Sequence, residues 1–203
     1  MCCGSGSGHF LERYNSKMRL ISMAAEIAPL AALFIGNAAA DIFVGAQAAV
    51  GCAAVIIVYN RVAERRWAAF ALFSVLVSAV FTATALLFGD SLFIKIQPSL
   101  FNGLFCLILL GGWVRGQAVM KLFFGAQFSL TLETWRSLSL RWGLFFGFLA
   151  LANEGAWRLL DDDGWVWFKV FFAAPLTGLF MLAQLPITLR GRIPPAPDNT
   201  NAP

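Results

Sequence analysis

Long apolar stretches separated by short polar ones dominate the pattern of this chain. Apolar runs cover residues 20–40, 42–59, 67–88, 99–114, 138–157 and 165–189. Most approach the ~20 residues that a helix needs to cross the hydrocarbon core of a bilayer. Asp41 and residues 60–66, 89–98, 115–137 and 158–164 connect them, and the first connection is so short that the first two runs form a hairpin. The pattern predicts an all-α protein, a polytopic transmembrane helical bundle of about six spans.

Two features of the chain ends modify this picture. Glu26 and Pro29 lie in the first run, so a re-entrant segment there would reduce the count to five spans. Residues 1–19 contain the sequence GSGSG, and residues 191–203 are rich in proline and asparagine. Such compositions are typical of flexible segments. We therefore expect cytoplasmic tails at 1–19 and 191–203 around a transmembrane helical domain at 20–190.

The composition agrees with a membrane protein and excludes two other classes. Apolar residues make up 59% of the 203 positions, charged residues 13%, and mean hydropathy is +0.73. Soluble domains carry about 25% charged residues, so this chain has too little polar surface for a soluble enzyme. The 20 phenylalanines and 7 tryptophans exclude a disordered chain.

The basic residues predict the orientation, because Lys and Arg near span ends stay on the cytoplasmic side. Lys95 and Arg158 are the two that fall on one side of the predicted spans, and Lys169 lies within a span. This split predicts that both termini are cytoplasmic and that the basic residues face lipid headgroups rather than nucleic acid. The twelve on the other side are Arg13, Lys17, Arg19, Arg61, Arg65, Arg66, Arg115, Lys121, Arg136, Arg141, Arg190 and Arg192.

Catalytic and metal chemistry has little basis in these residues. The four cysteines are Cys2, Cys3, Cys52 and Cys106, without the paired spacing of a zinc site or a disulfide framework, and the single histidine is His9 in the tail. The acidic run at residues 161–163 suits either a hard cation or, with more weight, a solvated loop. We therefore expect no catalytic residues, no metal site and no cofactor.

Polar side chains inside apolar runs are the remaining candidates, because charge is expensive in a membrane. Glu154 and Lys169 lie at matching depth in the last two runs, which favours an ion pair between helices over a ligand or proton site. Asn37, Asn102 and Asn153 fall near the same outer ends, where they either join helices or form a binding pocket with that pair.

A second set of candidates lies nearer the cytoplasmic ends. Glu26 and Gln184 are at similar depth near Arg141, where hydrogen bonds between helices are expected. Gly143 and Gly147 form a G-x-x-x-G face that another helix can approach closely. Residues 117–128 suit either a segment lying at the membrane interface or a loop folded back on the bundle.

Several ordered motifs resemble the intracellular septation protein A family, also called YciB. The resemblance extends from about Glu26 to Arg190. It is carried by Glu26, Pro29-Leu30 and Asn37, then FIKIQPSLFNGLF at 93–105, WRSLSLRWGLFF at 135–146, Asn153-Glu154, Trp157-Arg158, Trp165, FKVF at 168–171, Pro175-Leu176-Thr177, Gln184 and Pro186. The tail before Met18 is longer than in the family pattern, which leaves Met1, Met18 and Met23 as candidate starts.

The resemblance implies a bacterial inner-membrane protein that takes part in cell-envelope biogenesis and septation beside the division or elongation machinery. It carries over no active site. We interpret the chain as a non-enzymatic scaffold or membrane-homeostasis factor that contacts the lipid bilayer and division proteins. A small transporter or lipid-handling protein is the alternative, although its intramembrane charges would lie near the span ends. Whether the chain forms a homo-oligomer stays open.

Overall fold

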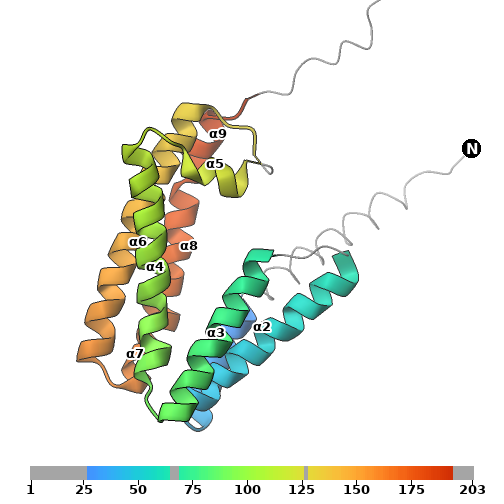
Figure 1. Ribbon diagram of the computed structural model, residues 1–203, viewed down its shortest axis with the longest axis vertical. Coiled ribbons are helices and arrows are strands. Elements are labelled where there is room, and N and C mark those ends of the chain that lie inside the picture. The colour runs from blue at the N-terminus through green and yellow to red at the C-terminus, as the bar shows by residue number, and fades with distance from the viewer. Residues whose placement is uncertain (1–26, 65–68, 126–127, 194–203) are drawn as a thin grey trace, which may run out of the picture. The chain divides into compact units, whose positions relative to one another are not determined.

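All regular structure in the described part of the chain is helical. The computed structural model describes residues 27–64, 69–125 and 128–193 (Figure 1). Outside the helices, one isolated antiparallel β-bridge joins Leu130 and Arg192 in these ranges. The expected all-α fold is confirmed.

Three helical segments in these ranges are long and apolar enough to cross a membrane: Ile42–Val62, Leu92–Val114 and Asp162–Arg190. The apolar helices Ile27–Ala39 and Leu72–Phe88 are shorter. Large apolar side chains on several helices are exposed, among them Val62, Leu87, Leu107 and Leu151. Exposed apolar surface of this extent is typical of helices that face lipid.

The chain divides into two compact units, each described here by itself. Unit 1 contains the chain up to Ile94 together with Asp161–Val170. Unit 2 contains Lys95–Leu160 and the chain from Phe171 onward.

Unit 1 begins with a tight helical hairpin. The helix Ile27–Ala39 is followed after Asp41 by α2 (Ile42–Glu64), whose first turn is capped because the backbone N–H of Val44 donates to Asp41 Oδ1 at 2.8 Å. Helix α3 (Ala69–Phe88) packs beside α2 (Figure 1). The short helix α7 (Asp162–Phe168) contacts α2 and buries Trp165 and Val166.

Glycines allow the two helices of this hairpin to approach closely. A Cβ on Gly45 would lie 2.5 Å from the carbonyl oxygen of Leu33, and one on Gly36 would lie 2.7 Å from the Cα of Gly45. Real Cβ contacts are never so short, so the interface requires residues without a side chain. The sequence analysis predicted the hairpin but did not single out these two glycines.

Unit 2 contains most of α4 (Leu92–Val114), then α5 (Val119–Phe124) and α6 (Leu132–Leu159). It ends with α8 (Ala174–Ala183) and α9 (Leu185–Arg190). Its core joins α4, α5 and α6 through one cluster of buried residues, against which Ile187 of α9 also packs: Leu109, Val119, Met120, Leu130, Trp135 and Leu138.

The segment between α4 and α6 is folded back on the core, one of the two alternatives for residues 117–128. Val119 and Met120 of α5 are buried, and the backbone N–H of Met120 donates to Ser139 Oγ at 3.1 Å. The opposite side of α5 exposes Leu122, 83% of whose surface is accessible. The α5 segment therefore has one side fixed against α6 and another that exposes apolar side chains.

The G-x-x-x-G face of α6 is a packing surface, as the sequence indicates. A Cβ on Gly143 would lie 2.7 Å from Leu110 Cδ2, and one on Gly147 would lie 3.0 Å from Cys106 Sγ. Both neighbours belong to α4. The two glycines therefore mark a place where α6 packs closely against α4.

The predicted connections are wrong at their ends. Residues 60–64 continue α2, residues 92–98 belong to α4, residues 132–137 belong to α6, and residues 158–159 and 162–164 are also helical.

Hydropathy marks where apolar residues stop, whereas caps mark where a helix starts. Asp90 Oδ1 accepts from the N–H of Leu92 at 2.8 Å, and Thr131 Oγ1 accepts from that of Thr134 at 3.3 Å. Pro98 lies within α4, where it removes one backbone donor without ending the helix.

The last helical segment changes its geometry near each proline. A π-helical turn, η1 (Lys169–Ala173), precedes Pro175, and Gln184 separates α8 from α9, where Pro186 follows. Both irregularities fit the loss of a backbone donor at proline.

The residues that follow, Gly191 to Ile193, lie in the expected C-terminal tail. Here the N–H of Thr131 donates to Gly191 O at 3.0 Å and that of Ile193 to Ser129 O at 2.9 Å.

Candidate functional site

The three aspartates at 161–163 fix the start of α7 in unit 1. Asp161 caps the helix, because its Oδ1 accepts from the N–H of Gly164 at 2.8 Å. Asp162 Oδ1 accepts from Ser91 Oγ at 2.9 Å, and Asp163 Oδ1 accepts from Asn37 Nδ2 at 2.7 Å. Asp161 and Asp163 are exposed, as a solvated segment would be, but Asp162 and Asp163 belong to a helix rather than to a loop. The run also ties α7 to the first hairpin and to the turn before α4. Carboxylates in a first helical turn also interact favourably with the helix dipole.

Asn37 is the buried member of this group. Only 8% of its surface is exposed, and its Oδ1 has no hydrogen-bond partner in the part of the chain that the structure describes. Its Nδ2 bond is to a carboxylate, and such charge-assisted bonds are stronger than neutral ones. Asp163 is thus the acceptor that makes the burial of this amide tolerable.

Lys169 lies in the π-helical turn and contacts an aromatic ring. Its Nζ is 5.2 Å from the centre of the Trp165 ring, a cation–π geometry. Trp165 is 1% exposed and belongs to the core of unit 1. The ammonium therefore lies beside a rigidly held ring, four residues earlier on the same helical segment.

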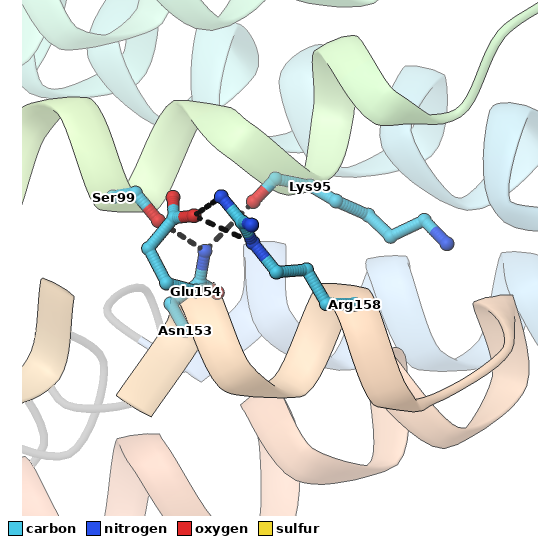
Figure 2. A network of polar contacts seen from close by, with 5 residues as sticks. All are labelled: Lys95, Ser99, Asn153, Glu154 and Arg158. Atoms are coloured by element: carbon cyan, nitrogen blue, oxygen red, sulfur yellow. Dashed lines mark hydrogen bonds and ion pairs between the residues drawn. The ribbon is translucent and has the colours of Figure 1, made fainter. Parts of the chain in front are cut away.

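A second polar group joins α4 and α6 in unit 2 (Figure 2). Asn153 Nδ2 donates to the carbonyl oxygen of Lys95 and to Ser99 Oγ, both at 2.8 Å. The side chain is 4% exposed. Both amide hydrogens of Asn153 are thus used to hold α6 against α4.

Glu154, the next residue, has a partner on its own helix. Its Oε2 accepts from Arg158 Nη2 at 2.9 Å and from Nε at 3.2 Å (Figure 2). Arg158 also lies over the ring of Trp157, with its Cζ 4.8 Å from the ring centre. The sequence analysis missed this partner, although opposite charges four residues apart on a helix are a local signal. Glu154 and Lys169 belong to different units, so their pairing stays a prediction.

The other candidates are distributed over the two units. Asn102 is half-buried on α4, and Arg141 Nη1 donates to Gln184 Oε1 at a long 3.4 Å between α6 and the α8–α9 junction. Gln184 Nε2 also donates to Phe180 O at 3.2 Å. Glu26 lies outside the described residues. The expected outer cluster has members in both units, Asn37 and Lys169 in unit 1 and Asn102, Asn153 and Glu154 in unit 2, so the cluster stays a prediction.

Ser91 and Ser99 are hydrogen-bonding partners that the sequence did not indicate. Each places a hydroxyl against an amide or a carboxylate from a distant element. Serine in an apolar helix is common enough that its presence alone carries little signal. The chemistry of both groups is hydrogen bonding between helices, and among the described residues no cluster of three or more His, Cys, Asp or Glu could hold a metal ion.

Comparison with known proteins identifies the family. The model of the intracellular septation protein A family matches residues 21–192. A protein of Nitrobacter hamburgensis named inner membrane-spanning protein YciB is 37% identical over 177 residues, which cover 87% of this chain and 89% of the relative. The protein of that name from Agrobacterium fabrum is 35% identical, covering 87% of this chain and 94% of the relative. No solved structure matches.

The matched range includes both polar groups, the glycine faces and every motif quoted for the resemblance. The chain belongs to the intracellular septation protein A family of inner membrane-spanning proteins.

Proposed function

We propose that this protein supports envelope integrity and septation as a non-enzymatic, multi-pass inner-membrane scaffold. The family name refers to septation, and the relatives are named as inner membrane-spanning proteins. The observation that carries the proposal is how the buried polar side chains are used. Asn37 with Asp163 and Asn153 with Ser99 each join two helices, and Ser91 with Asp162 joins the turn before α4 to α7.

A scaffold role fits this use of polar groups, because hydrogen bonds between helices hold a membrane protein in one conformation. Each such bond contributes a modest stabilising free energy. The glycines of α2 and α6 also favour a single conformation, because they allow neighbouring helices to approach closely. The basic residues at one set of helix ends would face the cytoplasm and the division or elongation machinery. Both termini would lie on that side, as the distribution of Lys and Arg favours.

The test combines a deletion strain with complementation. Cells lacking the protein should show altered length or osmotic sensitivity, and crosslinking in intact cells should capture division or elongation components. A variant in which His9 and the four cysteines are replaced should restore normal cells, because the scaffold needs no thiol or imidazole chemistry. A variant with Gly45→Leu, which separates the first hairpin, should not restore them despite its intact polar groups.

The transporter alternative makes the opposite prediction. Purified protein in liposomes would move a defined solute or lipid at a rate that is lost on Glu154→Gln. Such a result would replace the scaffold proposal. Unaltered growth and morphology of the deletion strain under osmotic stress would also contradict it.

A further inference from the structure

An open groove lies on the surface of unit 2, where α4 ends and α6 begins. It encloses about 500 Å³ and is lined by Trp113 from α4 and by Leu132, Glu133, Arg136, Ser137 and Leu140 from α6. The α6 residues recur at intervals of three or four, so they share one helix face. The opposite face, with Trp135 and Leu138, is buried in the core of the unit. The groove is therefore built on a well-packed helix.

Two residues of opposite charge line this groove, and among the described residues they form no ion pair with each other. Glu133 and Arg136 are three residues apart on α6, and both are exposed. Within the described residues neither forms an ion pair or a hydrogen bond through its side chain. Exposed ion pairs between such neighbours contribute little, about 0–1 kcal/mol. Both charged groups are thus available to a ligand that carries the complementary pair.

Apart from the two charged residues and Ser137, the side chains that line the groove are apolar. Leu132 is 60% exposed and Trp113 half-buried, although both are large apolar side chains. Trp113 is the penultimate residue of the candidate span Leu92–Val114. Tryptophan is enriched where hydrocarbon meets headgroups. The groove therefore lies where one end of a bound lipid would be apolar and the other charged.

We propose that this groove binds a membrane phospholipid whose headgroup joins a phosphate to a primary ammonium, as in phosphatidylethanolamine. The Arg136 guanidinium would bind the phosphate, for which its planar fork is suited. The Glu133 carboxylate would accept hydrogen bonds from the ammonium, and the Ser137 hydroxyl would donate to a phosphate or ester oxygen. Trp113, Leu132 and Leu140 would contact the glycerol and the first acyl carbons. The inference goes beyond the scaffold proposal, because it requires only that unit 2 lies in a bilayer.

Other headgroups match the groove less well. Phosphatidylglycerol carries a phosphate but no cation, so Glu133 would lie beside an uncompensated negative charge. Phosphatidylcholine carries a cation without N–H donors, so it cannot hydrogen-bond to that carboxylate. A soluble headgroup lacks the chains that the apolar wall would contact. The paired charges thus predict selectivity as well as affinity.

The experiment is a lipid titration of the purified full chain in detergent, followed by native mass spectrometry. The probes are phosphatidylethanolamine, phosphatidylcholine and phosphatidylglycerol with identical acyl chains. Phosphatidylethanolamine should bind about tenfold more tightly than the other two, since a hydrogen bond to a charged group contributes about one power of ten. Glu133→Gln should remove this preference and leave phosphatidylglycerol binding unchanged or stronger.

Arg136→Gln should weaken both phosphatidylethanolamine and phosphatidylglycerol about tenfold, because both carry the phosphate. Arg190→Gln, an exposed basic residue of α9 outside the groove, is the matched control and should change nothing. Ser137→Phe fills the groove and should block binding while circular dichroism shows unchanged helix content.

Three results would overturn the proposal. One is equal affinity for the three lipids, and another is undiminished phosphatidylethanolamine binding in both Glu133→Gln and Arg136→Gln. The third is displacement of the lipid by an equal concentration of soluble glycerophosphoethanolamine, which would show that the apolar wall contributes nothing. None of these results depends on a septation phenotype, so failure here and failure of the scaffold proposal are distinguishable.

Discussion

Single polar side chains in this protein are stabilised by partners on other elements. Burying an amide without a hydrogen bond costs free energy, and the cost is larger where water is excluded. Asn153 meets this requirement with Lys95 O and Ser99 Oγ, and Asn37 meets part of it with Asp163. At the scale of the residue, the bonded partner decides whether a buried polar group stabilises or destabilises the fold.

Replacing Asp163 tests this for unit 1. Asp163→Ala removes the acceptor of Asn37 Nδ2, which is part of a side chain only 8% exposed. We expect a loss of about 1–3 kcal/mol in the free energy of unfolding, seen as a lower melting temperature in detergent. Asp163→Asn retains an acceptor oxygen and should lose clearly less. Equal losses for both variants would show that the bond to Asn37 is unimportant.

Asn153 offers a matched comparison in unit 2. Asn153→Ala removes two hydrogen bonds between α6 and α4 and should lower stability by about 1–3 kcal/mol. Asn102→Ala is the control, because Asn102 is half-buried on α4 and forms no hydrogen bond within the described residues. Thermal unfolding followed by tryptophan fluorescence measures both. A larger effect at Asn102 would indicate that the outer asparagines have a role that these contacts do not explain.

Helices in this protein are positioned by small residues and by caps more than by their hydrophobic pattern. Gly45 permits backbone contact within the first hairpin, and Gly143 does the same between α6 and α4. Asp41, Asp90, Thr131 and Asp161 each cap a helix start. The apolar runs locate these elements approximately, while the caps and close contacts fix where each element begins and which neighbour it has.

Two alanine substitutions on α2 separate these effects. Gly45→Ala would place a Cβ 2.5 Å from Leu33 O and 2.9 Å from Asn37 N, both backbone atoms that cannot move independently. We expect a loss of about 1–3 kcal/mol in stability from this overpacking. Gly51→Ala, on the same helix with nothing within 4 Å, should instead gain up to about 1 kcal/mol from improved helix propensity. Equal melting temperatures for the two variants would exclude a tight hairpin.

For the whole molecule, the arrangement in the membrane is the central expectation. Three long apolar segments and two shorter apolar helices lie in the described ranges, together with α6. Helix α6 has 28 residues, but its charges at 133, 136, 141, 154 and 158 confine its apolar part to the middle. Six spans with both termini in the cytoplasm stay a prediction, which rests on the apolar runs and on the distribution of basic residues.

Cysteine labelling in intact cells tests this topology. In a background without the four native cysteines, Leu160→Cys in the α6–α7 connection should react with a membrane-impermeant thiol reagent. Gln117→Cys, between α4 and α5, should react only after the cells are permeabilised. Both positions are exposed, so accessibility differs through the membrane alone. The reverse pattern would invert the topology, and labelling of both positions would contradict it.

The sequence by itself determined the helical class, the first hairpin, the presence of a glycine face at Gly143 and Gly147, and the family. Each of these follows from local information: the length of apolar runs, the single residue Asp41 between two of them, the spacing of Gly143 and Gly147, and a series of ordered motifs. Such features depend on residues close in sequence, so no knowledge of neighbours in space is required.

The tertiary structure decided the partners of the polar side chains. A sequence gives the depth of Asn153 along its helix but not the direction of its side chain, and within unit 2 its amide donates to Ser99 Oγ. In the same way nothing in the sequence indicated that Asn37 lies against Asp163. Partners such as these are 126 or 54 residues apart in the chain, and only the packing of helices brings them within hydrogen-bond distance.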